Sequence, residues 1–208
     1  MKASNPAENL QKRVLHVGCG AATLAKLPRG FQDGSWSEVR FDINPNVRPD
    51  IIGTITDMVR VPSGSVDAVY SSHNIEHVYA HEVVPALQEF RRVLKDGGFA
   101  VITCPDLQAV AEHMRDGNLF DPIYSSPAGP ISPVDILYGH RASIARGETY
   151  MAHRTGFSLK TLTRCCVEAG FGSFFGRRHV SRLALWLLAT KQVTPSADLK
   201  QLFAAYAS

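Results

Sequence analysis

The sequence has little net charge, no long apolar segment and no apolar stretch near its start. The formal net charge at pH 7 is +3, from 22 Lys and Arg against 19 Asp and Glu, which is too small to indicate a nucleic-acid partner. The longest apolar run covers residues 183–189, whereas a helix needs about 20 apolar residues to cross a bilayer. Residues 1–13 lack the apolar core of a signal peptide. We therefore expect a cytoplasmic protein with no membrane partner.

Cysteine is also scarce, and the four cysteines show neither metal-ligand spacing nor a disulfide framework. Cys165 and Cys166 are adjacent on an expected helix, so a reducing compartment fits best. The densest basic cluster is interpreted as the solvated end of a strand rather than a binding patch. It consists of Arg177, Arg178, His179 and Arg182.

The order of the predicted elements is informative about the fold class. Strands are expected at residues 13–18, 37–43, 50–55, 66–73, 99–105, 173–181 and 183–191, and helices at 21–27, 81–98, 157–171 and 195–206. Strands that alternate with helices predict an α/β fold with a mostly parallel sheet of about seven strands. The tight connection between the last two strands predicts that the final strand is antiparallel.

The length suits one domain with an elaboration. We divide the 208 residues into a flexible N-terminus (1–12), a main domain (13–194) and a C-terminal segment (195–208). Within the main domain, residues 106–152 interrupt the alternation of strands and helices and are rich in Pro, Gly and Ser. This stretch is expected to be an insertion.

The stretch "RVLHVGCGAATLAKLP" places Gly18 and Gly20 at the end of the first strand, beside an expected helix N-terminus. Residues without side chains let a ligand lie against the backbone at such a turn. A dinucleotide fingerprint needs a third glycine three residues after Gly20, where Thr23 stands, so a pyrophosphate ligand is disfavoured. A tight turn that binds no ligand is the alternative.

Two acidic residues follow at the ends of the next two strands. Asp42 stands 22 positions after Gly20 (42 − 20), where a carboxylate can accept hydrogen bonds from the vicinal hydroxyls of a ribose. Asp57 can accept a hydrogen bond from an adenine amino group, and the Met58 side chain can pack on the ring. Either Asp alone is commonly a cap or turn residue, but the ordered set favours a nucleoside ligand.

At this point the sequence resembles a known family. The segments "VLHVGCGAATL", "FDINP", "DMVRVPSGSVDAVYSSHNIEHV" and "EFRRVLKDGGFAVITCPD" are similar to the successive motifs of class I S-adenosylmethionine-dependent methyltransferases, above all the type 11 small-molecule group. The resemblance covers residues 13–106, and "HRTGFSLKTLTRCCVEAGF" resembles the family's later helix. It implies a Rossmann-like fold and S-adenosyl-L-methionine as the cofactor.

The resemblance also implies roles for individual residues. Gly18 and Gly20 would flank the methionine part of the cofactor, Asp42 would hold the ribose, and Asp57 with Met58 would hold adenine. Further cofactor contacts would come from Cys19, Ile43, Ser72 and His73. His16 departs from the family, which often carries at this position an acidic residue that helps to place the methionine amino group.

The acceptor should meet the methyl group at the end of the fourth strand. Methylation of nucleobase amino groups typically goes with an Asn/Asp-Pro-Pro-aromatic motif there, whereas this chain has Ser71-Ser72-His73-Asn74. RNA cytosine methyltransferases place a nucleophilic cysteine near the position of Cys104 but also carry a Pro-Cys motif that is absent here. Cys104 is therefore interpreted as a small buried residue.

The segment "HNIEHVYAH" holds His73, Glu76, His77 and His81, which would share one face of a helix. One interpretation is a general base, with His73 and His77 as the catalytic candidates. A second is a divalent metal site formed by His73, Glu76 and His77 with His153, because some relatives that methylate vicinal hydroxyls or RNA ends use Glu-x-x-Glu-His. Helix capping and packing is the third.

The insertion at 106–152 can reach the carboxyl edge of the sheet, because it follows the fifth strand. We expect it to be a lid over the acceptor pocket that contributes Tyr138, His140, Arg141 or His153. A packed structural insertion far from the site is the alternative.

The predicted function is methyl transfer to an oxygen or nitrogen of a small-molecule or glycan-type acceptor. Two alternatives stay open. One is a cofactor-binding but catalytically silent partner subunit. The other is an RNA methyltransferase, which would bind RNA in a salt-dependent manner.

Overall fold

The protein is built on a seven-stranded sheet with the strand order β3-β2-β1-β4-β5-β9-β8. The computed structural model describes residues 11–126 and 128–207, so most of the predicted N-terminal segment 1–12 lies outside the described residues. The strands are β1 (Lys12–Val17), β2 (Trp36–Asp42), β3 (Ile51–Ile52), β4 (Val66–Ser72), β5 (Leu94–Pro105), β8 (Ser173–His179) and β9 (Ala184–Thr190).

All neighbouring strands pair in parallel except β9, which runs antiparallel to both β5 and β8. The predicted fold class, with an antiparallel last strand, is therefore confirmed. From β1 the chain moves outward to β2 and β3 and then returns to β4 on the other side of β1. This reversal leaves a crevice at the carboxyl ends of β1 and β4, which is where open α/β sheets bind ligands.

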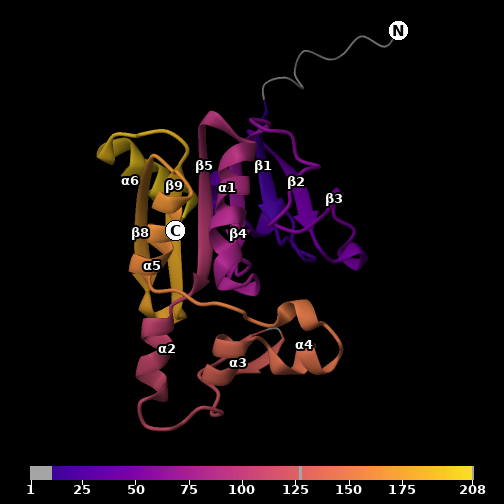
Figure 1. Cartoon of the computed structure of the whole chain (residues 1–208), viewed down its shortest axis with the longest axis vertical. Helices are drawn as coiled ribbons and strands as arrows, with labels where there is room; N and C mark the ends of the chain where they lie inside the picture. Colours follow the sequence, from indigo (N-terminus) through magenta and orange to yellow (C-terminus); the bar gives the residue numbers. More distant parts are fainter. Residues whose placement is uncertain (1–10, 127, 208) are drawn as a thin grey trace.

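Two helices cover the face of the sheet that is turned toward the viewer in Figure 1: α1 (Val83–Val93) and α5 (Leu159–Glu168). Their apolar stripes bury Leu87, Phe90, Leu162 and Cys166 in the main core. The helix predicted at 81–98 is shorter than expected. Leu94 is fully buried and leaves the helix in an extended conformation, so the chain enters β5 before the glycines at 97 and 98.

The opposite face of the sheet is covered by the C-terminal helix and not by the helix predicted after β1. The helix expected at 21–27 is wrong, because the chain forms only short 3-10 turns at Leu24–Lys26 and Arg29–Phe31 before β2 begins. Pro28 stands between the two turns and lacks the backbone N–H that would be needed to join them into one helix. The C-terminal helix α6 (Ser196–Tyr206) packs here instead and buries Leu199 and Phe203.

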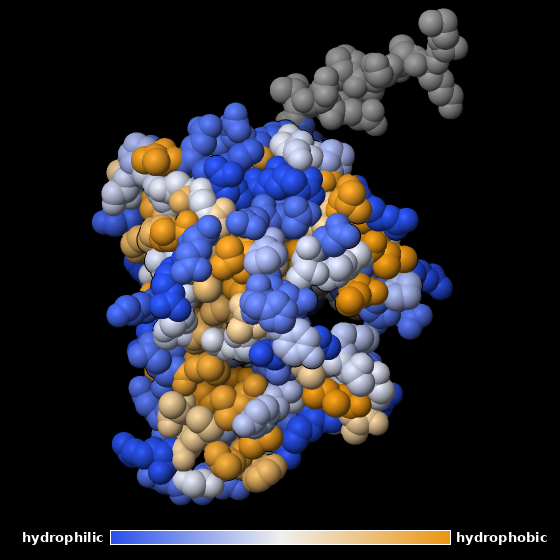
Figure 2. All heavy atoms as spheres, in the orientation of Figure 1, coloured by the Kyte–Doolittle hydropathy of each residue, from blue (hydrophilic) through white to orange (hydrophobic). Residues whose placement is uncertain are grey.

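Residues 106–152 form a lobe beyond the carboxyl edge of the sheet, which we call the insert lobe (Figure 1). It contains α2 (Leu107–Met114), a hairpin of β6 (Tyr124–Ser126) and β7 (Gly129–Ile131), α3 (Pro133–Tyr138), α4 (Arg141–Ala145) and a 3-10 turn at Thr149–Met151. Its own small core includes Val110, Ile131 and Ile136. Figure 2 shows hydrophobic side chains gathered on its surface, where Leu119 and Phe120 are among the exposed apolar residues.

A buried carboxylate orders the second half of this lobe. Asp135 accepts hydrogen bonds from the backbone and hydroxyl of Ser132 and from Arg141. Burial alone would raise the pKa of Asp135, but the hydrogen bonds from Arg141 and Ser132 hold that pKa well below its ordinary value. The Asp135 carboxylate is therefore ionised at neutral pH.

The two chain connections of the insert lobe leave the sheet side by side. Asp106, at the start of the lobe, forms a parallel bridge with Phe157, which follows its end. The buried Asp106 carboxylate also accepts a hydrogen bond from the Arg178 guanidinium at 2.6 Å. Part of the predicted solvated basic cluster is thus paired, because Arg178 ties β8 to this junction. None of the described helices is long and apolar enough to cross a membrane.

The packing of α6 on the sheet generates a stability prediction. Phe203→Ala should lower the free energy of unfolding by about 3–5 kcal/mol, because the ring is 4% exposed and packs edge-on against Phe175 at 4.9 Å. Urea unfolding followed by circular dichroism measures this change. Gln201→Ala, an exposed position on the same helix, should change the stability by less than about 0.5 kcal/mol. Equal effects of the two substitutions would mean that α6 does not stabilise the sheet.

Candidate active site

A cavity of about 330 Å³ lies at the carboxyl ends of β1, β2 and β4, against the end of the insert lobe. Figure 2 shows the surface hollowed between the sheet and that lobe. Five residues predicted for the site line this cavity: Gly18, Asp42, Ile43, His73 and His77. Chain segments far apart in the sequence thus meet at the crevice that the sheet topology creates.

The two glycines after β1 take the left-handed conformation that favours glycine, with φ of +63° at Gly18 and +51° at Gly20. A Cβ atom on Gly18 would lie 2.7 Å from Cγ of Asn74, so this position is closed to side chains by the segment after β4. Cys19 between them is buried and is not part of the cavity wall, and burial raises the pKa of its thiol to about 11. Its thiol is therefore neutral at physiological pH.

Asp42 links the glycine turn to the end of β2. Its Oδ2 accepts a hydrogen bond from the Gly20 N–H at 2.7 Å, and its Oδ1 accepts one from the Asn44 N–H at 2.8 Å. Each carboxylate oxygen can accept two hydrogen bonds, so one position on each remains for a ligand. A buried, oriented carboxylate of this kind suits a pair of vicinal hydroxyls.

Asp57 and Met58, expected at the adenine end, do not line the cavity. The third strand is only two residues long and is followed by a turn between Thr54 and Asp57, whereas the sequence suggested a strand to Ile55. Met58 is fully buried in the core, and Asp57 is exposed. The cavity wall at this level is made by Thr54, Ile55 and Thr56, which the prediction missed.

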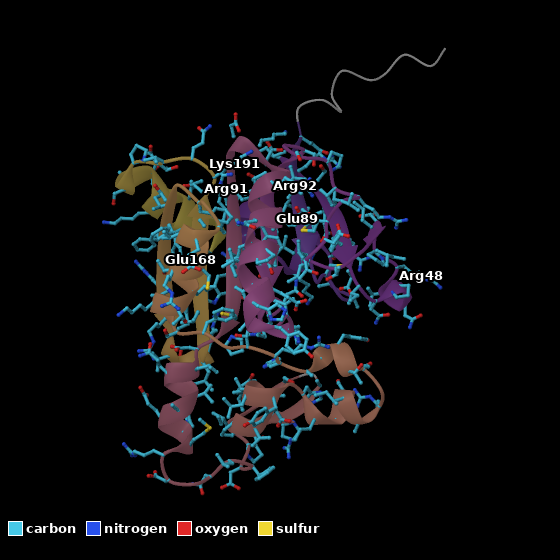
Figure 3. The ribbon with its side chains drawn as sticks, viewed as in Figure 1. Arg48, Glu89, Arg91, Arg92, Glu168 and Lys191 are labelled. Carbon is cyan, nitrogen blue, oxygen red and sulfur yellow. The ribbon has the colours of Figure 1, made fainter. Side chains whose placement is uncertain are left out.

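Two charged side chains of α1 explain why Met58 turns inward. Glu89 accepts a hydrogen bond from the Met58 N–H at 2.8 Å, and Arg92 donates one to the Met58 carbonyl at 2.9 Å. Glu89 and Arg92 also pair with each other at 2.6 Å, and Figure 3 shows both on α1. Met58 is thus fixed in the core from both sides of its peptide.

His16 lies away from the cavity. Its Nδ1–H donates to Glu38 Oε1 at 2.6 Å, and its ring meets Tyr70 edge-on at 5.5 Å, on the side of the sheet where the second core lies. Burial lowers the pKa of His16 in spite of the Glu38 carboxylate, so the imidazole is neutral at pH 7. His16 therefore serves the packing of β1 on β2.

The segment after β4 is not the continuous helix that would place four predicted residues on one face. His73 has a φ of +49°, and the chain then forms short 3-10 turns at Ile75–His77 and Ala80–Glu82. His81 stacks on Tyr79 and does not line the cavity. His73, Glu76 and His77 still come together, because the turn rather than a helix brings them to the end of β4.

Glu76 is fully buried, and neither of its carboxylate oxygens has a hydrogen-bond partner among the described residues. Its Oε1 lies 3.4 Å from His73 Nδ1 and 4.0 Å from His153 Nε2. Burial raises the pKa of Glu76, but His73, His77 and His153 lower it by more, so it ends below its ordinary value. An ionised carboxylate without hydrogen bonds is costly inside a protein unless a cation neutralises it.

The histidines beside Glu76 are held in one orientation. His77 Nδ1 lies 3.2 Å from the Ala152 carbonyl, and His153 Nδ1 lies 2.7 Å from the Ile136 carbonyl. A carbonyl oxygen only accepts hydrogen bonds, so both Nδ1 atoms carry the proton and both Nε2 lone pairs are free when the rings are neutral. Desolvation lowers the pKa of His153, which keeps that ring neutral at pH 7.

Glu76, His77 and His153 together have the donor set of a metal site. One ligand atom from each lies within 4.8 Å of the others. Metal-binding histidines typically donate their second ring N–H to a carbonyl, as both do here. His73, the fourth predicted member, lies beside Glu76 with a half-exposed ring, and desolvation lowers its pKa less than Glu76 raises it.

Most of the insert-lobe residues predicted for the site do not line the cavity. Tyr138 is 65% exposed, His140 bonds to Ser143, and Arg141 pairs with Asp135; none of the three lines the cavity. The wall instead contains Tyr150, Met151 and Arg154, from the end of the lobe and the residues after it.

A single hydrogen bond connects this end of the lobe to the loop after β2. The side-chain amide of Asn44, two residues beyond Asp42, donates to the Tyr150 hydroxyl at 2.8 Å.

Ser72 and Cys104, which were also considered for the site, do not line the cavity. Ser72 forms a hydrogen bond with Thr103 at 2.9 Å, and Cys104 is fully buried. Burial raises the pKa of the Cys104 thiol well above its ordinary value. Cys104 is therefore a packing residue.

Comparisons with known proteins agree with this architecture. The sequence model of a family described as a methyltransferase domain matches residues 15–102. No curated protein matches the sequence.

Solved structures share the fold. The CMeT domain of citrinin polyketide synthase has a TM-score of 0.58 at 12% identity, and the match covers 88% of this chain but only 47% of that one. A chain from the complex of the Haloferax volcanii Trm112 methyltransferase activator also has a TM-score of 0.58 at 12% identity, with coverages of 88% and 84%. The Burkholderia thailandensis 1,6-didemethyltoxoflavin-N1-methyltransferase with bound S-adenosylhomocysteine has a TM-score of 0.55 at 13% identity, with coverages of 89% and 73%.

The Tyr150–Asn44 contact generates a prediction about the insert lobe. Tyr150→Phe removes one hydrogen bond worth about 1 kcal/mol, so amides near residues 149–154 should exchange with solvent roughly fivefold faster. Hydrogen exchange followed by mass spectrometry measures this. Tyr138→Phe, at an exposed position of the same lobe, should leave the exchange unchanged. Unchanged exchange in Tyr150→Phe would show that the contact does not hold the lobe.

Proposed function

We propose that the chain is a class I S-adenosylmethionine-dependent methyltransferase that methylates an oxygen or nitrogen of a small-molecule or glycan-type acceptor. The methyltransferase-domain model over residues 15–102 and the shared fold of the solved methyltransferases support this activity. The observation that carries the proposal is one cavity shared by two kinds of group. Gly18 and Asp42 form one side, and His73 and His77 lie at the end of β4 on the other. A nucleoside-type cofactor and a deprotonating group would therefore lie next to each other.

The cofactor supplies a methyl group that is already activated on a sulfonium, so the protein mainly has to align the acceptor and exclude water. In this proposal Asp42 accepts hydrogen bonds from the ribose hydroxyls, while Thr54, Ile55 and Thr56 form the wall that Asp57 and Met58 do not. Gly18 is the residue of the glycine turn that lines the cavity, and the methionine part would lie beside it. The insert lobe covers the cavity with Tyr150 and Met151.

A neutral acceptor also needs a group that takes its proton. We assign this role to His73, whose half-exposed ring lines the cavity and whose pKa is raised by Glu76. Glu76, His77 and His153 would hold a divalent cation, which would supply Lewis-acid charge at the acceptor and neutralise the buried carboxylate. If no metal binds, His77 becomes the second candidate for the base, because its Nε2 is unprotonated when the ring is neutral.

A catalytically silent partner subunit is the alternative. One structural neighbour comes from a complex between the Trm112 methyltransferase activator and a methyltransferase, which supports a protein partner but not the loss of catalysis. Methyl transfer by the isolated chain would separate the two functions. Binding of the cofactor without transfer to any member of a metabolite pool would favour the silent subunit.

The assignment of Asp42 predicts a loss of cofactor affinity. Asp42→Ala should weaken the binding of both S-adenosylmethionine and S-adenosylhomocysteine by about 1.5–3 kcal/mol, the range of hydrogen bonds to a charged group. Isothermal titration calorimetry measures both affinities. Asp57→Ala is the matched control and should change neither, because Asp57 is exposed and off the cavity wall. Unchanged affinity in Asp42→Ala would remove that residue from the site, and tighter binding of NAD would overturn the cofactor assignment.

The metal assignment predicts a chelator effect with a defined ion preference. Two imidazoles and one carboxylate suit Mn²⁺ or Zn²⁺ better than Mg²⁺. A chelator should stop turnover. Mn²⁺ should then bind the metal-free protein in isothermal titration calorimetry, and Glu76→Gln should weaken this affinity at least tenfold. His81→Gln, on the same segment but outside the cluster, should bind Mn²⁺ normally. Full turnover in chelator and no Mn²⁺ binding would leave only the base and packing roles.

A further inference from the structure

Arg154 is a cation in the cavity wall without an acidic partner among the described residues. The arginines of the insert lobe provide the contrast. Each of them has an acidic neighbour: Arg115 with Asp116, Arg141 with Asp135 and Arg146 with Glu148. Arg154 therefore carries the one arginine charge in this region of the described chain that is not already neutralised by a carboxylate.

Two contacts fix the position of Arg154. Its backbone N–H donates to the Glu76 carbonyl at 2.8 Å, so the residue is anchored to the same residue whose carboxylate lies at the centre of the His/Glu cluster. Its guanidinium lies over the Tyr79 ring, with Cζ 4.6 Å from the ring centroid. Stacking uses the face of the guanidinium and leaves its in-plane N–H donors free.

The acidic residue on the same wall does not consume these donors. Glu82 accepts a hydrogen bond from the Tyr79 N–H through Oε2 at 2.8 Å and forms no ion pair with Arg154. Asp42, the other wall carboxylate, holds the N–H groups of Gly20 and Asn44. The in-plane N–H donors of the Arg154 guanidinium are thus available to a ligand. Their planar arrangement matches the oxygens of a carboxylate or phosphate.

We propose that Arg154 selects acceptors that carry an anionic group, a carboxylate or a phosphate, and binds that group beside the His/Glu cluster. This inference rests on the proposed function, because it assigns the acceptor to the part of the cavity that contains His77 and Arg154. The acceptor is then held by its charge at Arg154, while its nucleophilic oxygen or nitrogen lies toward the histidines. Arg154 acts here as a specificity-determining residue and takes no part in proton transfer.

The test uses simple probes because it needs only the charge of the ligand. The protein is titrated with benzoate, phenyl phosphate and neutral benzamide at low ionic strength, with and without saturating S-adenosylhomocysteine, and binding is followed by ligand-observed NMR. We expect at least one anion to bind at least tenfold more tightly than benzamide. The anion that binds better tells a carboxylate site from a phosphate site.

Arg154→Gln should abolish the preference for the anion, and Arg154→Lys should keep part of it because the charge remains without the fork. Arg146→Gln removes a lobe arginine of the same charge outside the cavity wall and should leave the preference intact. Equal binding of the three probes to the unmodified protein, or a preference that survives in Arg154→Gln, would overturn the inference. S-adenosylhomocysteine affinity in the same samples reports on the proposed function separately, since Arg154→Gln should not change it.

Discussion

The buried Glu76 carboxylate must be neutralised, and the surroundings of the site are arranged around that requirement. Three histidines from two distant segments surround the carboxylate, two of them with their Nδ1–H groups held by carbonyls. The Glu76 backbone has a second role, because its carbonyl accepts hydrogen bonds from the N–H groups of Arg154 and Thr155 at 2.8 and 3.2 Å. The charge and the peptide of one residue therefore position both the cluster and the end of the insert lobe.

The sheet topology explains why these groups meet the glycine turn after β1. The reversal between β1 and β4 brings the glycine turn and the end of β4 into contact, and Gly18 packs directly on Asn74. The connection between β1 and β2 forms only 3-10 turns, and α6 covers that face of the sheet from the other end of the chain. The carboxyl ends of β1 and β4 thus form one side of the cavity, and the end of the insert lobe forms the other.

Much of the sheet could be predicted from the sequence, because buried apolar runs and the Gly and Pro residues that end them are local signals. The positions of Gly18, Asp42 and His77 on the cavity follow from the rule that strand ends share one edge. What failed depended on contacts that the sequence does not express locally. Met58 turns inward, and its peptide is held by hydrogen bonds to Glu89 and Arg92 of α1, the two side chains labelled on that helix in Figure 3. His73 has a positive φ, and short turns stand where a helix was expected. No role in the site was predicted for Tyr150 or Arg154.

The bridge between Asp106 and Phe157 has a consequence for how freely the insert lobe can differ in size. The two ends of the lobe are already held together by the sheet, so a longer or shorter lobe does not change the distance that must be closed. Doubling the length of a flexible loop with fixed ends costs only about 0.6 kcal/mol of chain entropy. The insert lobe can therefore tolerate insertions and deletions, whereas the glycine turn and the end of β4 cannot change length without breaking the contact between Gly18 and Asn74.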